Sequence, residues 1–132
     1  MTRSVLEGVA FGIKDSFSLI QTSGLGQVEQ VRISGGGAKS ELWRQIMADV
    51  YNKRILKPRL LQEATSLGAA IAGGVGVGLF ENYRAAEAMV QIVDTQDPNP
   101  SAHACYERLH GVFQSAYTAL VPVFEELAQL HA

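Results

Sequence analysis

The chain has 132 residues, of which 47% are hydrophobic and 18% are charged, a balance typical of a single folded domain. Its formal net charge of −2 gives no indication of binding to nucleic acid or to an anionic membrane. There is no recognisable signal peptide or membrane-spanning run, and the single cysteine cannot form an internal disulfide, so we expect a cytoplasmic protein. The three histidines and the cysteine lack metal-ligand spacing, so no metal site is predicted.

The first predicted element is a helix from Ser4 to about Gln21. Ser4 and Glu7 have the spacing of a capping box, which marks a helix start. Apolar residues then recur at helical spacing: Leu6, Val9, Ala10, Ile13, Phe17 and Ile20. Gly8 and Gly12 lie inside this pattern, where each costs about 1 kcal/mol relative to alanine. We therefore expect both glycines to allow close packing against a neighbouring element.

A turn predicted at 23–26 leads to the stretch around which the chain is organised, Val31–Asp49. A predicted strand over 28–34 is followed by three glycines, Gly35–Gly37, and then by a predicted helix over 40–52. Strand, glycine turn and helix start form a common arrangement for holding an anion or a nucleotide against the backbone. A tight turn that binds no ligand has the same pattern.

Two established phosphate-binding motifs fit this stretch poorly. A Walker A loop requires glycine directly before its lysine and serine, but Ala38 precedes Lys39 and Ser40. A dinucleotide fingerprint requires glycine in place of Ser40 and an acidic residue about 20 positions later. Asp49 comes too early and Glu63 too late, so a dinucleotide-binding domain is a less favoured alternative.

The middle of the chain predicts a second strand over 54–60, which Pro58 should end or confine to a sheet edge. The third predicted helix, 63–74, consists almost wholly of small residues. Such a helix allows another element to come very close, either in a packed core, which the pattern favours, or at a domain hinge. A flexible glycine-rich exit over 74–78 and a fourth helix over 83–92 are expected next.

Asp97–Pro100 should break the chain before a last helix over 101–130, which Pro122 should kink or split. The strands predicted at 28–34 and 54–60 are joined through a helix, so they should be parallel if adjacent. Two parallel strands make a poor sheet on their own. The chain therefore looks like part of a larger α/β sheet.

Three blocks of sequence resemble one family: RSVLEGVAFGIKDSF, GGGAKSELWRQIMADV and EATSLGAAIAGGVGVGLF. They are similar to the C-terminal end of the FGGY carbohydrate kinases, and among these they look most like the xylulokinases. The resemblance implies an α/β fold: a partial ribonuclease-H-like domain of the actin-type ATPases. It implies that residues 1–132 are the C-terminal part of a sugar-kinase C-terminal domain, with two parallel strands, flanking helices and a long C-terminal helix at 101–130.

The resemblance also implies a site, because it identifies 31–49 as the adenosine motif of the family. The implied nucleotide-binding residues are Gly35, Gly36, Gly37, Ala38, Lys39 and Ser40. Gly36 and Gly37 would let the adenosine and α-phosphate lie on the backbone, and Ser40 stands where the family has an adenine-contacting side chain. Lys39 could approach the phosphates, although a solvated lysine is the simpler role.

The family's catalytic aspartate, its phosphate-binding hairpins and most of its sugar contacts lie upstream of the matched blocks. No catalytic residue is therefore expected here, and Asp15 and Asp49 are interpreted as structural or solvated. We expect a fragment that transfers no phosphate alone and supplies a nucleotide shelf and a hinge-type helix, 63–74. In the intact kinase it would work with ATP or ADP, Mg²⁺, a sugar such as D-xylulose and the N-terminal remainder.

A non-catalytic, self-associating module is the main alternative from another class. Missing sheet partners would leave an exposed strand edge and apolar helix faces, which favour association between copies. A homo-oligomer is therefore expected.

Overall fold

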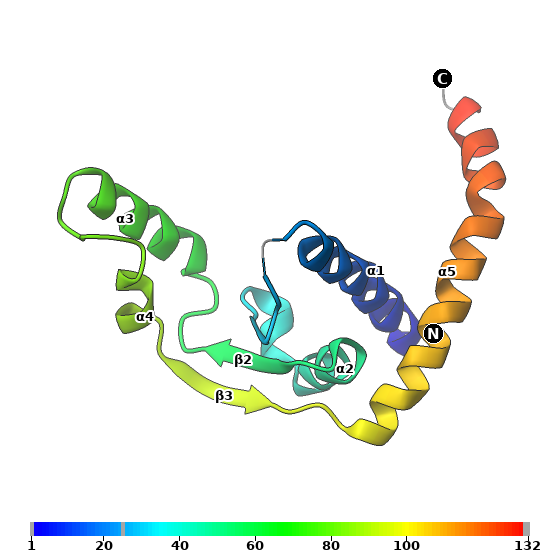
Figure 1. Cartoon of the computed structure of the whole chain (residues 1–132), viewed down its shortest axis with the longest axis horizontal. Helices are drawn as coiled ribbons and strands as arrows, with labels where there is room; N and C mark the ends of the chain where they lie inside the picture. Colours follow the sequence, from blue (N-terminus) through cyan, green and yellow to red (C-terminus); the bar gives the residue numbers. More distant parts are fainter. Residues whose placement is uncertain (1, 25, 131–132) are drawn as a thin grey trace.

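The computed structural model describes residues 2–24 and 26–130. The elements in chain order are α1 (Thr2–Thr22), β1 (Gln30–Arg32), the short 3₁₀ helix η1 (Gly36–Lys39), α2 (Glu41–Tyr51), β2 (Arg54–Pro58), α3 (Ala64–Gly76), α4 (Ala85–Met89), β3 (Ile92–Gln96) and α5 (Pro100–Gln129). The molecule is elongated, with α1 and α5 toward one end, α3 and α4 at the other, and the sheet with α2 between them (Figure 1).

The described strands form one sheet in the order β1-β2-β3. β1 and β2 are adjacent and parallel, with Val31 opposite Ile55, which confirms the predicted parallel pairing. β3 runs antiparallel to β2, with Leu56 opposite Thr95. The α/β class is therefore confirmed, but the prediction of only two strands is wrong.

The missed strand lies where a helix was predicted over 83–92. That helix, α4, ends at Met89, and the chain becomes a strand at Ile92. Apolar residues on both sides of Gln91 fit the helix period and the strand period equally well, so pairing with β2 decides which structure forms. β1 is also shorter than the predicted strand at 28–34, and β2 ends at Pro58 as predicted.

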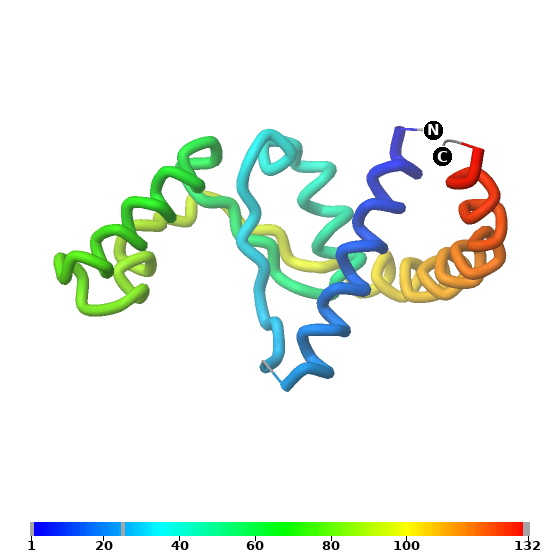
Figure 2. The backbone as a smooth tube through the Cα atoms, turned by 90° about the horizontal axis from the view of Figure 1, so that it is seen from above, coloured from blue at the N-terminus to red at the C-terminus, as the bar shows by residue number. Residues whose placement is uncertain are grey.

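The core forms around α2, which packs against the strands on one side and against α1 and α5 on the other (Figure 2). Its buried members come from all these elements: Ala10, Phe11, Ile46, Met47, Ala48, Val50, Tyr51, Ile55 and Tyr106. The rings of Phe11 and Tyr106 meet edge to face with their centroids 6.0 Å apart, which joins α1 to α5. This apolar contact fixes the two long helices beside α2.

Helix ends follow the sequence closely. Ser40 caps α2, and Asn52 ends it in the left-handed conformation with φ 51°. Asn99 caps α5 with Pro100 in its first turn, so the last helix begins at the predicted break, Asp97–Pro100. The α5 helix is not split at Pro122, although its axis curves (Figure 2).

Two predictions about small residues are wrong. A Cβ added at Gly8 or Gly12 would meet no atom within 4 Å, so neither glycine permits a close approach in the described chain. The third helix, α3, continues to Gly76 and buries only Ile71 and Gly74, so it is not a core helix of this chain.

The predicted turn at 23–26 includes residue 25, which lies outside the described residues. None of the helices described is both long and apolar enough to cross a bilayer.

Polar contacts reinforce the junction between α1 and α5. The Glu7 carboxylate accepts hydrogen bonds from Arg3 Nε at 2.9 Å and from the Tyr106 hydroxyl at 2.8 Å. Partial burial acts to raise the pKa of Glu7, but these two hydrogen bonds outweigh it and hold the pKa below its ordinary value. The ammonium group of Lys14 similarly lowers the pKa of Glu107 on α5.

These pKa shifts predict acid sensitivity. A carboxyl with a lowered pKa in the folded state stabilises the fold above its unfolded-state pKa, and that stabilisation is lost as pH falls through the folded-state pKa. The free energy of unfolding should therefore fall between about pH 6 and about pH 3. In Glu7→Gln, urea unfolding measured across this range should show a smaller fall than in the unmodified chain. An unchanged pH dependence in this variant would contradict the assignment.

Candidate functional site

The segment Gly35–Ser40, here called the glycine loop, connects β1 to α2. It begins with Gly35 at φ 77° and ψ −172°, a conformation that is essentially restricted to glycine. The loop then makes one 3₁₀ turn, in which Ala38 N donates to Gly35 O and Ser40 N donates to Gly37 O. The three glycines therefore form part of an ordered 3₁₀ turn.

The outer side of the loop is open at its first two glycines. A Cβ added at Gly35 or Gly36 would meet no atom within 4 Å, and Gly36 is exposed. Gly37 differs, because an added Cβ would lie 3.0 Å from Cδ1 of Trp43. A flat ligand can therefore approach the backbone at Gly36, next to the indole ring of Trp43.

The other predicted site residues divide by exposure. Ala38 is 2% exposed, so its methyl group belongs to the interior. Lys39 is exposed at the end of the turn. Ser40 is exposed too, and its Oγ accepts a hydrogen bond from Trp43 N at 3.2 Å, which caps α2. The α2 N-terminus favours negative charge beside the loop, although the Glu41 carboxylate in its first turn opposes an anion.

A buried arginine that sequence reasoning missed holds the loop from behind. Arg44 is 3% exposed, and its Nη1 donates to Ala38 O at 2.8 Å and to Lys39 O at 3.4 Å. Its Nη2 donates to Asp94 Oδ2 at 2.7 Å and its Nε to Gln96 Oε1 at 2.6 Å. One guanidinium therefore joins the last carbonyls of the 3₁₀ turn to two side chains of β3.

A signal for Arg44 was present in the sequence. It lies three and four residues before Met47 and Ala48, on the side of α2 that is buried. A charged residue in the buried register of a helix needs partners, because an unpaired buried charge is costly. Those partners come from β3, the strand that was not predicted.

The start of the loop is fixed by the backbone. Ile33 N donates to Leu56 O at 3.1 Å, which extends the parallel pairing of β1 and β2. Gly35 N donates to Leu61 O at 2.8 Å, in the segment after β2. With both ends held, Gly36 is presented on a rigid support.

Both Asp15 and Asp49, which were interpreted as structural or solvated, have hydrogen-bond partners within the chain. Asp15 Oδ1 lies 2.9 Å from His110 Nε2 and 2.9 Å from Gln114 Nε2. Asp49 is buried and accepts hydrogen bonds from Gln45 Nε2 and from Asn99 N. Among residues 2–24 and 26–130, no group of three or more His, Cys, Asp or Glu side chains is placed to hold a metal ion.

Comparison with known proteins identifies the class. The family model "FGGY family of carbohydrate kinases, C-terminal domain" matches residues 1–77. A xylulose kinase of Staphylococcus epidermidis is 32% identical over 116 residues, which cover 87% of this chain and 23% of that protein. An autoinducer-2 kinase of Yersinia enterocolitica is 35% identical over 115 residues, which cover 80% of this chain and 22% of that protein.

Solved structures agree. The xylulose kinase of Rhodospirillum rubrum superposes with a TM-score of 0.79 at 27% identity, covering 93% of this chain and 25% of that one. The ligand-bound xylulose kinase of Lactobacillus acidophilus gives 0.80 at 24% identity, covering 96% of this chain and 26% of that one, which shows the shared fold alone. The fold is that of the actin-like ATPases, an α/β domain of the sugar-kinase type.

The chain belongs to the FGGY family of carbohydrate kinases, as its resemblance indicated. It spans less than a quarter of the length of the curated xylulose and autoinducer-2 kinases named above.

The loop geometry predicts unequal effects of two matched substitutions. Gly35→Ala should lower the free energy of unfolding by about 1–3 kcal/mol, because alanine strongly disfavours the Gly35 backbone conformation. Gly36→Ala should stay within about 0.5 kcal/mol of the unmodified chain, since its Cβ meets open space at an ordinary φ. Urea unfolding followed by circular dichroism measures both variants, and equal losses would show that the backbone conformation of Gly35 is not the constraint.

Proposed function

We propose that this chain is the nucleotide-holding C-terminal portion of a carbohydrate kinase that transfers the γ-phosphate of ATP to a sugar hydroxyl. The observation that carries the proposal is the open backbone at Gly36, held between the Gly35–Leu61 hydrogen bond and the buried guanidinium of Arg44. The kinases with which the chain shares its family are named for xylulose and autoinducer-2. D-xylulose is the sugar that we favour.

In this proposal the residues that hold the nucleotide are Gly35, Gly36, Gly37, Ala38, Lys39 and Ser40. The absence of side chains at Gly35 and Gly36 leaves room for a purine or ribose to lie on the main chain. Ala38 can contribute only backbone contacts, because its side chain is buried. Lys39 is free of the interior and able to reach a phosphate.

The remaining parts of the chain have proposed roles in the same kinase. The adenosine motif is 31–49, the hinge-type helix is 63–74, and the C-terminal helix is 101–130. Open space around Gly68 and Gly73 supports the hinge role, because a second helix could slide at short range along α3. Exposure of these glycines is a feature that a packed core helix would not have.

The reacting groups of such a kinase would come from elsewhere. When bound, Mg²⁺ with ATP supplies charge neutralisation at the transferring phosphoryl group. The residues described here hold and orient the adenosine side, and none is placed to take the proton of a sugar hydroxyl. The proposed partners are the nucleotide, the sugar and the N-terminal remainder of the kinase, in the cytoplasm, with no role for nucleic acid or membrane.

A bulky residue at Gly36 should abolish nucleotide binding without unfolding the chain. ADP should bind the unmodified chain weakly, since a single wall of a cleft gives little enclosure. Its addition should shift the amide resonances of Gly36 and Gly37 and change the emission of Trp43, the only tryptophan. Gly36→Val should remove these changes, while Gly111→Val, at an equally open glycine on α5, should retain them.

Two further arms complete this experiment. NAD should not change the amide resonances or the Trp43 emission more than ADP does. A change in these signals with NAD but not with ADP would favour a dinucleotide-binding domain. The chain with ATP, Mg²⁺ and D-xylulose should form no sugar phosphate. Turnover at the rate of an ordinary kinase would overturn the assignment of the reacting groups to another part of the protein.

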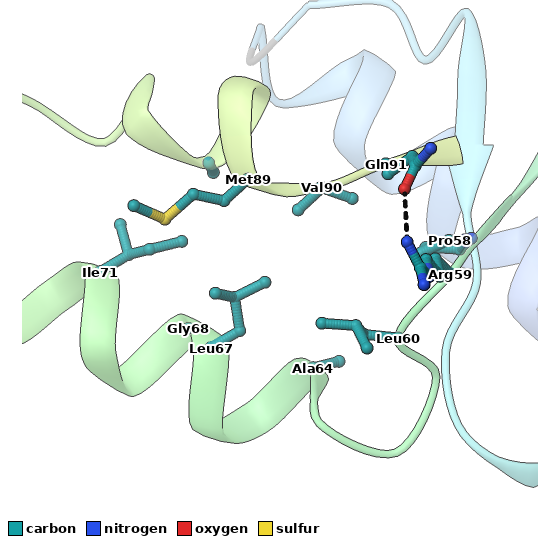
Figure 3. A pocket seen from close by; sticks show the side chains of 11 residues that line it. Pro58, Arg59, Leu60, Ala64, Leu67, Gly68, Ile71, Met89, Val90 and Gln91 are labelled. Atoms are coloured by element: carbon teal, nitrogen blue, oxygen red, sulfur yellow. Dashed lines mark hydrogen bonds between the residues drawn. The ribbon is translucent and has the colours of Figure 1, made fainter. Parts of the chain in front are cut away.

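Exposed apolar surface favours a second candidate function, a self-associating module. The outer half of α5 carries exposed apolar residues at helical spacing: Tyr117, Leu120, Phe124 and Leu127. At the other end of the molecule, an apolar groove of about 450 Å³ lies between α3 and α4 (Figure 3). Its lining includes Leu60, Leu67, Ile71, Met89 and Val90, with the Arg59–Gln91 hydrogen bond at one end.

Association through these surfaces predicts a dimer or a tetramer in sedimentation velocity. Phe124→Glu should then shift the chain toward the monomer, because it puts a charge in the apolar row of α5. Thr118→Glu, an exposed change outside that row, should leave the distribution unaltered. A stable monomer at all concentrations would count against this candidate.

A further inference from the structure

The buried guanidinium of Arg44 lies directly behind the surface that the proposed function assigns to the nucleotide. We propose that Arg44 is the positioning residue of this nucleotide loop, and that Asp94 and Gln96 make β3 the strand that sets the loop's geometry. This inference rests on the proposed function and extends it, because Arg44 acts on the nucleotide through the loop and does not touch it.

The hydrogen bonds of the 3₁₀ turn explain why it needs this support. Gly37 O accepts from Ser40 N, but the carbonyls of Ala38 and Lys39 have no following turn of the same helix to supply donors. Arg44 donates to both of them. Without it, the buried carbonyl of Ala38 would lose its partner, and the turn would gain by unwinding toward water.

The guanidinium suits this position better than an ammonium would. Its fork donates simultaneously in different directions, to the loop through Nη1 and to β3 through Nη2 and Nε. A lysine has a single nitrogen on a flexible stem, so it would keep the charge and lose part of the fork. The Arg44→Lys variant therefore separates geometry from charge.

The charges around Arg44 are balanced by one carboxylate. The carboxylate belongs to Asp94, whose side chain is 41% exposed, and Gln96 supplies a neutral acceptor, so this partly buried pair is close to neutral overall. A nearly neutral pair exerts only a weak electrostatic field on a bound ligand. Arg44 should therefore affect binding through the shape of the loop. Adenosine, which has no phosphate, should then depend on Arg44 as strongly as ADP does.

The test compares Arg44→Lys with Arg54→Lys. Arg54 donates to Asp97 at 2.6 Å, and both side chains are more than half exposed, so this pair is a matched surface control that joins β2 to the residue after β3. Titration with ADP or adenosine changes the chemical shift of the Gly36 amide. The change per unit of added ligand should be about fivefold smaller in Arg44→Lys than in the unmodified chain, and less than about twofold smaller in Arg54→Lys. The unliganded Trp43 emission should also change in Arg44→Lys alone, because the indole lies where a Cβ of Gly37 would meet it and so senses the position of the loop.

Each alternative result has one meaning. ADP binding to Arg44→Lys at the unmodified level would overturn this inference and leave the proposed function standing. Loss of ADP binding with full retention of adenosine binding would show an effect confined to the phosphates, and not on the part of the loop that holds the adenosine, and would also overturn it. If the unmodified chain bound neither ligand, the proposed function would fail. The inference would then be overturned if Trp43 emission and the Gly36 amide were unchanged in Arg44→Lys.

If Arg44→Lys fails to fold, Asp94→Asn replaces it. This variant keeps Arg44 and the shape of its partner, but weakens the hydrogen bond that aims the guanidinium at the loop. In Asp94→Asn, the change in the Gly36 amide chemical shift per unit of added ADP or adenosine should be about threefold smaller than in the unmodified chain. An unchanged value would contradict the role of β3.

Discussion

The interaction on which this structure most depends is the set of hydrogen bonds around one buried guanidinium. An arginine removed from water is tolerated only when its donors are satisfied, since the desolvation cost is several kcal/mol in order of magnitude. Arg44 meets that condition with acceptors from the glycine loop and from β3, which are far apart in sequence. The loop, the helix that carries the arginine and the outer strand are therefore placed as one unit.

The α2 helix connects this unit to the rest of the fold. Its first turn adjoins the glycine loop through the Ser40 cap, and its later turns bury Ile46, Val50 and Tyr51 in the core. Because the same helix packs against α1 and α5, the position of the loop is coupled to the whole apolar core. A nucleotide bound at Gly36 would rest on a loop that is joined to the apolar core through α2.

The two ends of the molecule are different in character. Few residues of α3 are buried, and much of the outer half of α5 is exposed and apolar. Under the proposed function these surfaces would meet the N-terminal remainder of a kinase, whereas a self-associating module would cover them with further copies. Either arrangement would remove apolar surface from water, which is the main driving force for association.

The sequence by itself determined the features whose physical causes are local. Ser40 and Asn99 cap their helices through side chains that bond amides two or three residues away, and Pro58 ends β2 because it has no amide hydrogen. The strand–glycine–helix order of the predicted site could also be predicted, because it depends on local sequence. Tertiary structure alone decided the features that depend on distant partners. The run at Ile92 became a strand because β2 offered an edge, Arg44 became buried because β3 supplied its acceptors, and the indole of Trp43 lies beside Gly37 and leaves Gly36 open.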